Sequence, residues 1–174
     1  MITDIYPAGK KAAGASWFLW FGEEPPSSPP TLAEVQAATV LDLTCYLMAD
    51  GTEIGMDQAR EDDTRACHNS TSESFGATTF TKESILHIVD PQEKGLAEGN
   101  KAREVVQANA TQYCGVVNGI DHETGTVAAA ALMDVYRVEC GEDHISPASS
   151  GKFLREVKTS WSRVQKAAAI APGP

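Results

Sequence analysis

Residues 111–140 read TQYCGVVNGIDHETGTVAAAALMDVYRVEC, and this stretch predicts two strands joined by a turn. The apolar runs 111–119 and 126–140 flank DHETG at 121–125, a polar segment that ends in glycine and is typical of a tight turn. The second run ends with Tyr136, Val138 and Cys140 on one side and Arg137 and Glu139 on the other. Because successive side chains of a strand point to opposite faces, the alternation predicts a β-hairpin with one buried face.

Three other segments show the same period of two. VLDLTCYLM at 40–48 has the clearest strand pattern, with Leu41, Leu43, Cys45 and Leu47 on one face. TTFTKESILHIVD at 78–90 places Phe80, Leu86 and Ile88 together, after a turn or hairpin end at 72–76. KFLREVKTSWSRV at 152–164 alternates Phe153, Val157 and Trp161 with Glu156, Lys158 and Ser160. These patterns predict a mainly β fold.

A single segment has the signals of a helix. Asp90 can cap a helix and Pro91 suits its first turn, so we expect a helix over 92–108. Gly95 and Gly99 each cost about 1 kcal/mol relative to alanine. The helix therefore needs a neighbour to pack against, through Leu96, Ala102, Val105 and Val106.

The chain is expected to form one domain whose strands are joined by long loops. At 174 residues the chain fits one domain with its own core. The Pro-rich segment 22–31 and the acidic segment 48–63 are expected to be loops, and long loops of this kind are usually functional or disordered. The last residues, 166–174, are expected to form a flexible tail.

The composition excludes several classes of protein. Against 14 Lys and Arg stand 24 Asp and Glu, a formal net charge of −10, and such a surface repels phosphate and argues against sequence-specific nucleic-acid binding. No run approaches the roughly 20 apolar residues that span a bilayer, and the apolar stretch 17–21 is too short for a signal peptide core. In a cytoplasm, Cys45, Cys67, Cys114 and Cys140 are expected to be free thiols.

Two Cys–His pairs, Cys67 with His68 and Cys140 with His144, raise the question of a metal or catalytic site. Structural zinc sites usually contain cysteines two to four positions apart, whereas the smallest separation here is 67 − 45 = 22 positions. His87 lies in an apolar strand pattern, where a hydrogen-bonded structural histidine is common, and Cys45, Cys114 and Cys140 fit apolar strand phases.

The motifs of nucleophilic, zinc and nucleotide chemistry are also missing from the sequence. We expect no catalytic residue, metal or cofactor. A small enzyme or metal-binding protein that uses the two Cys–His pairs stays an alternative.

The acidic segment and the segment after it are the candidate sites for interaction. The first supplies carboxylates from Asp50, Glu53, Asp57, Glu61, Asp62 and Asp63. It lacks the alternating order of a calcium-binding EF-hand loop, and a solvated loop and a loop docked on Lys or Arg of another subunit both stay open. The second contributes Arg65, His68, Ser70, Ser72, Thr79, Thr81 and Glu83. Polar strands with open edges invite pairing with another chain, although an ordinary solvent-facing sheet has the same pattern.

Taken in order, these segments resemble the major tail tube proteins of long-tailed bacteriophages, the siphoviruses, and particularly those that infect actinobacteria. The likeness is carried by DLTCYLMADG (42–51), DDTRACHNSTSESFG (62–76), HIVDPQ (87–92), NKAREVVQANATQYCGVVNG (100–119) and FLREVKTSWS (153–162). It spans about 36–165 and rests on the arrangement of segments rather than on an invariant chemical motif.

The resemblance implies a β-sandwich flanked by one α-helix, with a long hairpin that pairs between subunits. Six subunits would form a ring, and stacked rings would form a tube in the virion that conducts double-stranded DNA without binding it specifically. The expected partners are further copies of the chain, the tape measure protein, the tail tip and the tail terminator, with no membrane partner. Synthesis is expected in the host cytoplasm.

By position, the N-terminal arm 1–16 and the acidic loop 48–63 match segments that become ordered between rings, and 64–83 matches the hairpin that lines the lumen or joins subunits. A tail terminator or tail completion protein with the same fold is the alternative within this class.

Overall fold

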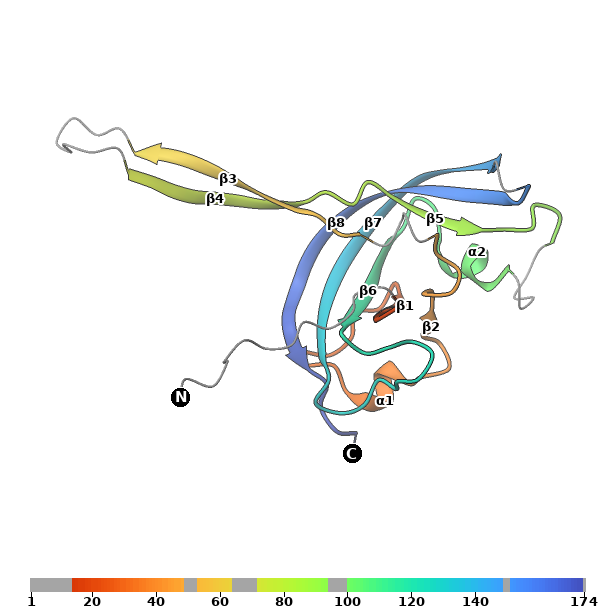
Figure 1. Cartoon of the computed structure of the whole chain (residues 1–174), viewed down its shortest axis with the longest axis horizontal. Coiled ribbons are helices and arrows are strands. Elements are labelled where there is room, and N and C mark those ends of the chain that lie inside the picture. Colours follow the sequence, from red (N-terminus) through yellow and green to blue (C-terminus); the bar gives the residue numbers. More distant parts are fainter. Residues whose placement is uncertain (1–13, 49–52, 64–71, 94–99, 149–150, 174) are drawn as a thin grey trace, which may run out of the picture.

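A computed structural model describes residues 14–48, 53–63, 72–93, 100–148 and 151–173 of the chain. Its strands are β1 (Ser16–Gly22), β2 (Leu41–Asp42), β3 (Met56–Asp63), β4 (Ser72–Phe80), β5 (Ser84–Ile88), β6 (Thr111–Asn118), β7 (Leu132–Pro147) and β8 (Phe153–Ala169), and its helices are α1 (Leu32–Val35) and α2 (Lys101–Val105). The described strands form one sheet in the order β2-β1-β6-β7-β8-β4-β3, and β5 pairs with β8 beside β4 (Figure 1). The prediction of a mainly β fold is confirmed.

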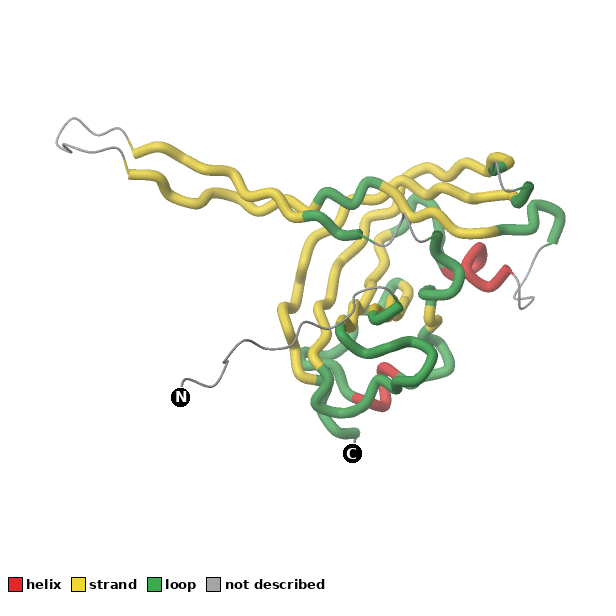
Figure 2. The backbone as a smooth tube through the Cα atoms, in the orientation of Figure 1, coloured by secondary structure: helices red, strands yellow, loops and turns green. Residues whose placement is uncertain are grey.

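The sheet is curled, and it buries apolar side chains on both of its faces. β7 and β8 curve over the rest of the molecule (Figure 2). One core contains Trp20, Val138 and Trp161 and is closed by α2. The other contains Val117, Met133 and Ile170 and is closed by α1 and the β6–β7 connection. The layered core that was expected of a sandwich is therefore built on a single curled sheet, which α2 flanks.

The predicted hairpin at 111–140 is formed by β6 and β7, with Cys114 opposite Tyr136. Tyr136, Val138 and Cys140 are buried and Arg137 and Glu139 are exposed, as the alternation predicted. The connection is longer than a tight turn, because β7 begins only at Leu132. Asp121 Oδ1 accepts hydrogen bonds from the backbone N of Glu123 and Thr124, which fixes the polar turn, and the chain then buries Val127 before β7 begins.

The strand predicted at 40–48 is wrong beyond its first residues, because β2 contains only Leu41–Asp42. Asp42 Oδ1 accepts a hydrogen bond of 2.9 Å from the backbone N of Thr44, and Leu47 N donates to Leu43 O. An aspartate that bonds the backbone two residues ahead favours a turn over an extended strand. Cys45 is consequently exposed and does not share the apolar face on which the pattern placed it.

The segment 78–90 forms two strands rather than one. β4 ends at Phe80 and β5 begins at Ser84, and the predicted turn at 72–76 lies within β4. In β5 the buried side chains are Ile85 and His87, whereas Leu86 and Ile88 are half-buried, so the predicted phase is wrong. Apolar residues occur on both faces of this short strand, and its pairing with β8 therefore decides which face is inside.

The helix predicted over 92–108 is reduced to α2, five residues from Lys101 to Val105. Residues 94–99 lie outside the described part, and Pro91 and Gln92 are not helical. Asn100 directly precedes α2, and its buried side chain accepts a hydrogen bond from the backbone N of Asp90 at 3.0 Å and donates one to the backbone O of Glu93 at 2.8 Å. Ala102 and Val106 still pack into the core as predicted.

The C-terminal segment is not the flexible tail that was expected over 166–174. β8 continues to Ala169, Ile170 is only 1% exposed, and Ala171 bridges to Thr31 just before α1. Of the Pro-rich loop predicted at 22–31, Gly22 ends β1, and residues 23–30 contain no helix or strand. Of the N-terminal arm predicted at 1–16, residues 1–13 lie outside the described part and Ser16 begins β1.

Candidate functional site

The acidic segment and the polar segment after it form the two strands of one hairpin. β3 pairs with β4 in antiparallel register, from Met56 opposite Phe80 to Asp63 opposite Ser72. The hairpin projects away from the rest of the molecule (Figures 1 and 2). The prediction of a loop throughout 48–63 is therefore wrong, because 56–63 is a strand.

The predicted site residues are distributed along this hairpin and its base. Asp57 is exposed and pairs with Thr79, while Glu53 is exposed just before β3. In the register, Glu61 pairs with Ser74, Asp62 with Glu73 and Asp63 with Ser72. Thr81 and Glu83 are exposed at the base, where Thr81 N donates to Gly55 O and Thr159 N donates to Glu83 O. Asp50, Arg65, His68 and Ser70 lie outside the described residues.

The two faces of the hairpin differ in character. Met56 and Phe75 are 60% and 71% exposed, and the guanidinium of Arg60 lies 5.9 Å from the centroid of the Phe75 ring. Asp57 and Thr79 occupy the next register position after Met56 and Phe80, and therefore the opposite face. The hairpin thus presents apolar side chains to solvent on one face and polar side chains on the other.

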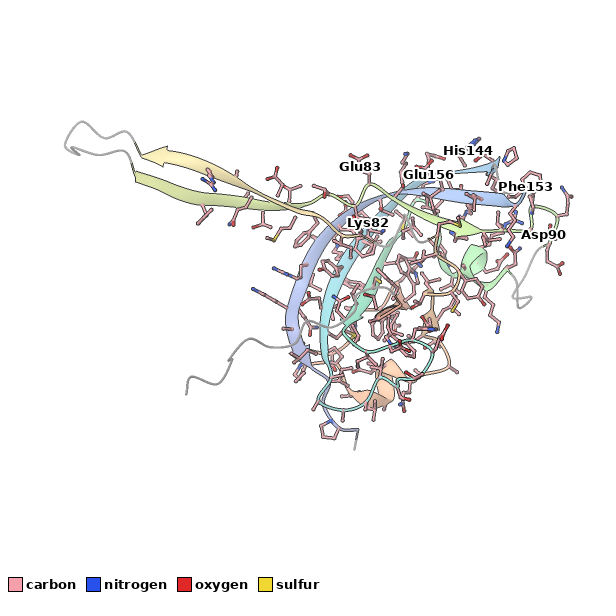
Figure 3. All side chains as sticks on the ribbon, in the orientation of Figure 1. Lys82, Glu83, Asp90, His144, Phe153 and Glu156 are labelled. Atoms are coloured by element: carbon pink, nitrogen blue, oxygen red, sulfur yellow. The ribbon has the colours of Figure 1, made fainter. Side chains whose placement is uncertain are left out.

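A second polar surface lies on the outer side of β7 and β8. We define this polar face by Arg137, Glu139, His144, Glu156, Lys158, Ser160 and Ser162. Val138, Val157 and Trp161 lie between them in sequence and are buried on the inner side. Figure 3 shows His144 and Glu156 on this side of the sheet, with Glu83 near the base of the hairpin. The predicted outward positions of Arg137, Glu139, Glu156, Lys158 and Ser160 agree with this arrangement.

Each strand of the polar face contains an ion pair between residues two positions apart. Arg137 lies 2.8 Å from Glu139 on β7, and Lys158 lies 2.6 Å from Glu156 on β8. The hydrogen bond with Lys158 is the main cause of the lowered pKa of Glu156, and the same bond raises the pKa of Lys158. The carboxylates thus offset the positive charges of Arg137 and Lys158 within one subunit.

Buried polar side chains connect the strands beneath the polar face. Arg155 is 6% exposed, and its Nε donates to Asp143 Oδ2 at 2.6 Å. One terminal nitrogen of its guanidinium donates to the carbonyl oxygens of Arg103 and Val106 at 2.9 and 2.8 Å, at the end of α2. Arg155 therefore ties together β8, β7 and α2.

His87 lies opposite Arg155 in the pairing of β5 with β8. Its ring is fully buried, and within the described residues neither ring nitrogen has a hydrogen-bond partner. The expectation of a hydrogen-bonded structural histidine is therefore wrong. Burial, with a smaller contribution from the nearby charge of Arg155, lowers the pKa of His87 to about 4.

Of the two Cys–His pairs, the one within the described residues, Cys140 with His144, does not form a site. Cys140 is buried and has its pKa raised to about 11 by burial, whereas His144 is exposed on the polar face. Cys67 and His68 lie outside the described residues. In the part of the chain that is described, no group of three or more His, Cys, Asp and Glu side chains could hold a metal ion.

The structure instead brings together Asp42, Cys45 and His122, which the sequence patterns did not connect. His122 Nε2 lies 2.6 Å from Asp42 Oδ2, and its Nδ1 lies 3.8 Å from Cys45 Sγ. The ring of Trp17 packs on the imidazole with 4.3 Å between centroids. The cluster joins the β6–β7 connection to the turn after β2, 80 positions earlier in the chain, and this separation hid it from motif analysis.

Residues 12–174 match the family model described as "Phage tail tube protein". A search of curated proteins found no match. Neither α1 nor α2, the helices of the described residues, is long and apolar enough to cross a membrane.

Proposed function

The chain belongs to the phage tail tube protein family and is thus a structural subunit of a tail tube, and we propose that six copies close into a ring. Stacked rings then form the conduit for the phage genome. The resemblance of segments within 42–162 supports a siphovirus of actinobacteria as the source. Under this proposal the subunits are made in the host cytoplasm and assemble with the tape measure protein, tail tip and tail terminator, in a structural rather than enzymatic role.

The observation that carries the ring proposal is the hairpin at the end of the sheet. β3 is the last strand in the sheet order, and the described part of β4 pairs with β8 only where Phe80 meets Trp161. Unpaired strand edges can accept a strand from another copy, and closure of a ring removes them. A hairpin that extends beyond its own subunit supports pairing between copies.

We propose further that the polar face of β7 and β8 lines the lumen and continues onto the hairpin at Asp57 and Thr79. Lys and Arg side chains that face the lumen of a DNA conduit should not bind the DNA phosphates, because each phosphate that a protein cation neutralises releases counterions and adds affinity. The ion pairs Arg137–Glu139 and Lys158–Glu156 meet this need by offsetting each of those cations within the subunit. Passage of DNA then depends on local charge pairing as well as on the net charge of −10.

Assembly of the purified chain tests the proposed function. We expect electron micrographs to show rings or tubes after concentration, or after addition of tail tips, and virion mass spectrometry to show many copies of the chain. A chain that stays monomeric in all these conditions would contradict the tube proposal. About six copies per virion would favour the tail terminator.

Substitution of one lumen carboxylate tests the lumen assignment. In Glu139→Gln, Arg137 loses its partner, and we expect assembled tubes to bind double-stranded DNA more tightly. The dependence of log K on log salt should steepen by about 0.9 for each additional phosphate that the lumen neutralises. Titration of labelled DNA at several salt concentrations measures this change.

The matched control is Glu123→Gln, which makes the same charge change at an exposed position in the β6–β7 connection. We expect it to leave DNA binding near that of the unaltered tube. Equal increases in affinity in the two variants would show that net charge alone controls binding and would contradict a lumen role for the polar face.

A further inference from the structure

An open groove of about 930 Å³ lies at the end of the molecule where β5 and β7 end and β8 begins. Its apolar lining includes Ile88, Ile145 and Phe153, and its charged lining consists of Asp90 and Lys152. Phe153 is 46% exposed, so the groove presents an aromatic side chain to solvent. Figure 3 shows Asp90 and Phe153 at the end of the molecule opposite the β3–β4 hairpin.

The hairpin carries apolar side chains of a complementary kind. Phe75 is 71% exposed and Met56 is 60% exposed, on strands that extend away from the core of their own subunit. A strand the length of β3, eight residues, reaches about 26 Å at 3.3 Å per residue. These side chains therefore lie where another subunit can cover them.

We propose that the groove receives the apolar face of the hairpin of a second copy, with Phe75 packed against Ile145 and Phe153. The inference rests on the proposed tube function and names the surface that receives the hairpin. The two surfaces also carry charges of opposite sign, Arg60 beside Phe75 with the acidic residues of β3 on the hairpin, and Asp90 with Lys152 in the groove. The hairpin thus offers the groove exposed apolar side chains together with charged groups that can pair with Asp90 and Lys152.

The position of the two surfaces decides what kind of assembly they make. The hairpin and the groove are different surfaces at opposite ends of one chain, so their contact is heterologous. A heterologous contact repeats from one copy to the next and closes into a ring if the rotation allows it. The same contact thereby covers the exposed Phe75 side chain of each copy and joins each copy to the next around the ring.

Disulfide trapping between copies tests the contact. Phe75→Cys and Phe153→Cys are made separately in a chain with Cys45→Ser and Cys67→Ser, which keeps only the buried Cys114 and Cys140 of the native thiols. The two variants are mixed, assembled and treated with a mild oxidant. We expect a covalent dimer from the mixture and little from either variant alone. A mixture of Leu132→Cys with Phe153→Cys is the control, because Leu132 is also exposed, at 59%, but lies away from both surfaces.

Truncation of the same side chains gives a second measurement. We expect Phe75→Ala to raise the concentration needed for assembly roughly 10- to 100-fold, from the lost burial of one aromatic side chain. Phe153→Ala should act similarly, and the double variant should be little worse than either, because the two side chains share one contact.

The two levels of proposal fail differently. If the unaltered chain forms rings or tubes but the Phe75→Cys and Phe153→Cys mixture gives no more dimer than the Leu132→Cys control, the groove contact is wrong and the tube function stands. If the unaltered chain never assembles, the tube function fails and the contact fails with it. A bound small molecule that fills the groove in assembled tubes would also overturn the contact.

Discussion

Replacing Arg155 by methionine is expected to lower the free energy of unfolding by about 3 kcal/mol. The guanidinium is almost fully buried and donates to Asp143 on β7 and to two carbonyl oxygens at the end of α2. Methionine fills much of the same space but donates no hydrogen bond, so the two carbonyls and the carboxylate lose their partner. Urea denaturation followed by tryptophan fluorescence measures the loss, with Trp161 on the same strand as a reporter.

Lys158→Met on the same strand is the matched control. Lys158 also pairs with a carboxylate, but its side chain is 64% exposed, and ion pairs in contact with water contribute little to stability. We expect the urea midpoint of Lys158→Met to stay close to that of the unaltered chain. If both variants lost the same stability, the buried bonds of Arg155 would not be the cause.

Stability is expected to fall steeply between pH 6.5 and pH 4 because His87 is buried in its neutral form. The pKa of His87 is about 4 in the folded chain, against an ordinary value of 6.5 when it is exposed. Below pH 6.5 the unfolded chain therefore binds a proton that the folded chain does not, and stability decreases as pH falls. The maximum slope is about 1.4 kcal/mol per pH unit, so the loss approaches about 3 kcal/mol at pH 4.

His87→Leu removes the titrating group and is expected to flatten this dependence. Loss of two buried nitrogens without partners also makes the substitution neutral or stabilising at pH 7. Denaturation midpoints at pH 7, 6 and 5 measure this dependence. They also separate His87 from Glu34, because the pKa of Glu34 is about 2 and its contribution to stability is lost only as pH falls below about 4.5. A slope that is unchanged in His87→Leu would assign the acid sensitivity to another group.

The strands that could be predicted from the sequence are those with one buried face and one solvent-exposed face. β7 and β8 alternate buried and exposed side chains, and the sequence patterns indicated their phase at Val138 and Val157. Their ends were not predicted, because β7 runs on to Pro147 and β8 to Ala169, and Phe153, expected on the face of Val157, is 46% exposed. β1 escaped recognition because its WFLWF run packs into cores on both faces, which removes the alternation. β3 escaped for the opposite reason, since its described side chains are exposed on both faces and its acidic composition is that of a loop.

The candidate surfaces also differ in how far the sequence predicts them. The polar face follows from local alternation, so Arg137, Glu139 and Lys158 could be placed outward from sequence. The bonds of Arg155 to residues 49 and 52 positions away, and the groove formed by the ends of three strands, depend on tertiary approach that no local pattern encodes. The turn at Asp42 shows the same limit at short range, because one side-chain hydrogen bond overrode a clear strand pattern.

The junction between β4 and β8 also has a mechanical consequence. In the described chain these strands form a ladder pair at one position, Phe80 with Trp161, and Thr159 N also donates to Glu83 O, so few backbone bonds fix the angle between the hairpin and β8. A rotation of roughly 10° at the base of the hairpin moves its far end, about 26 Å away, by about 4.5 Å, which is close to the spacing of neighbouring strands in a sheet. We therefore expect a small change of angle at the base of the hairpin to move its far end by about one strand spacing without any change in the pairing of β7 with β8.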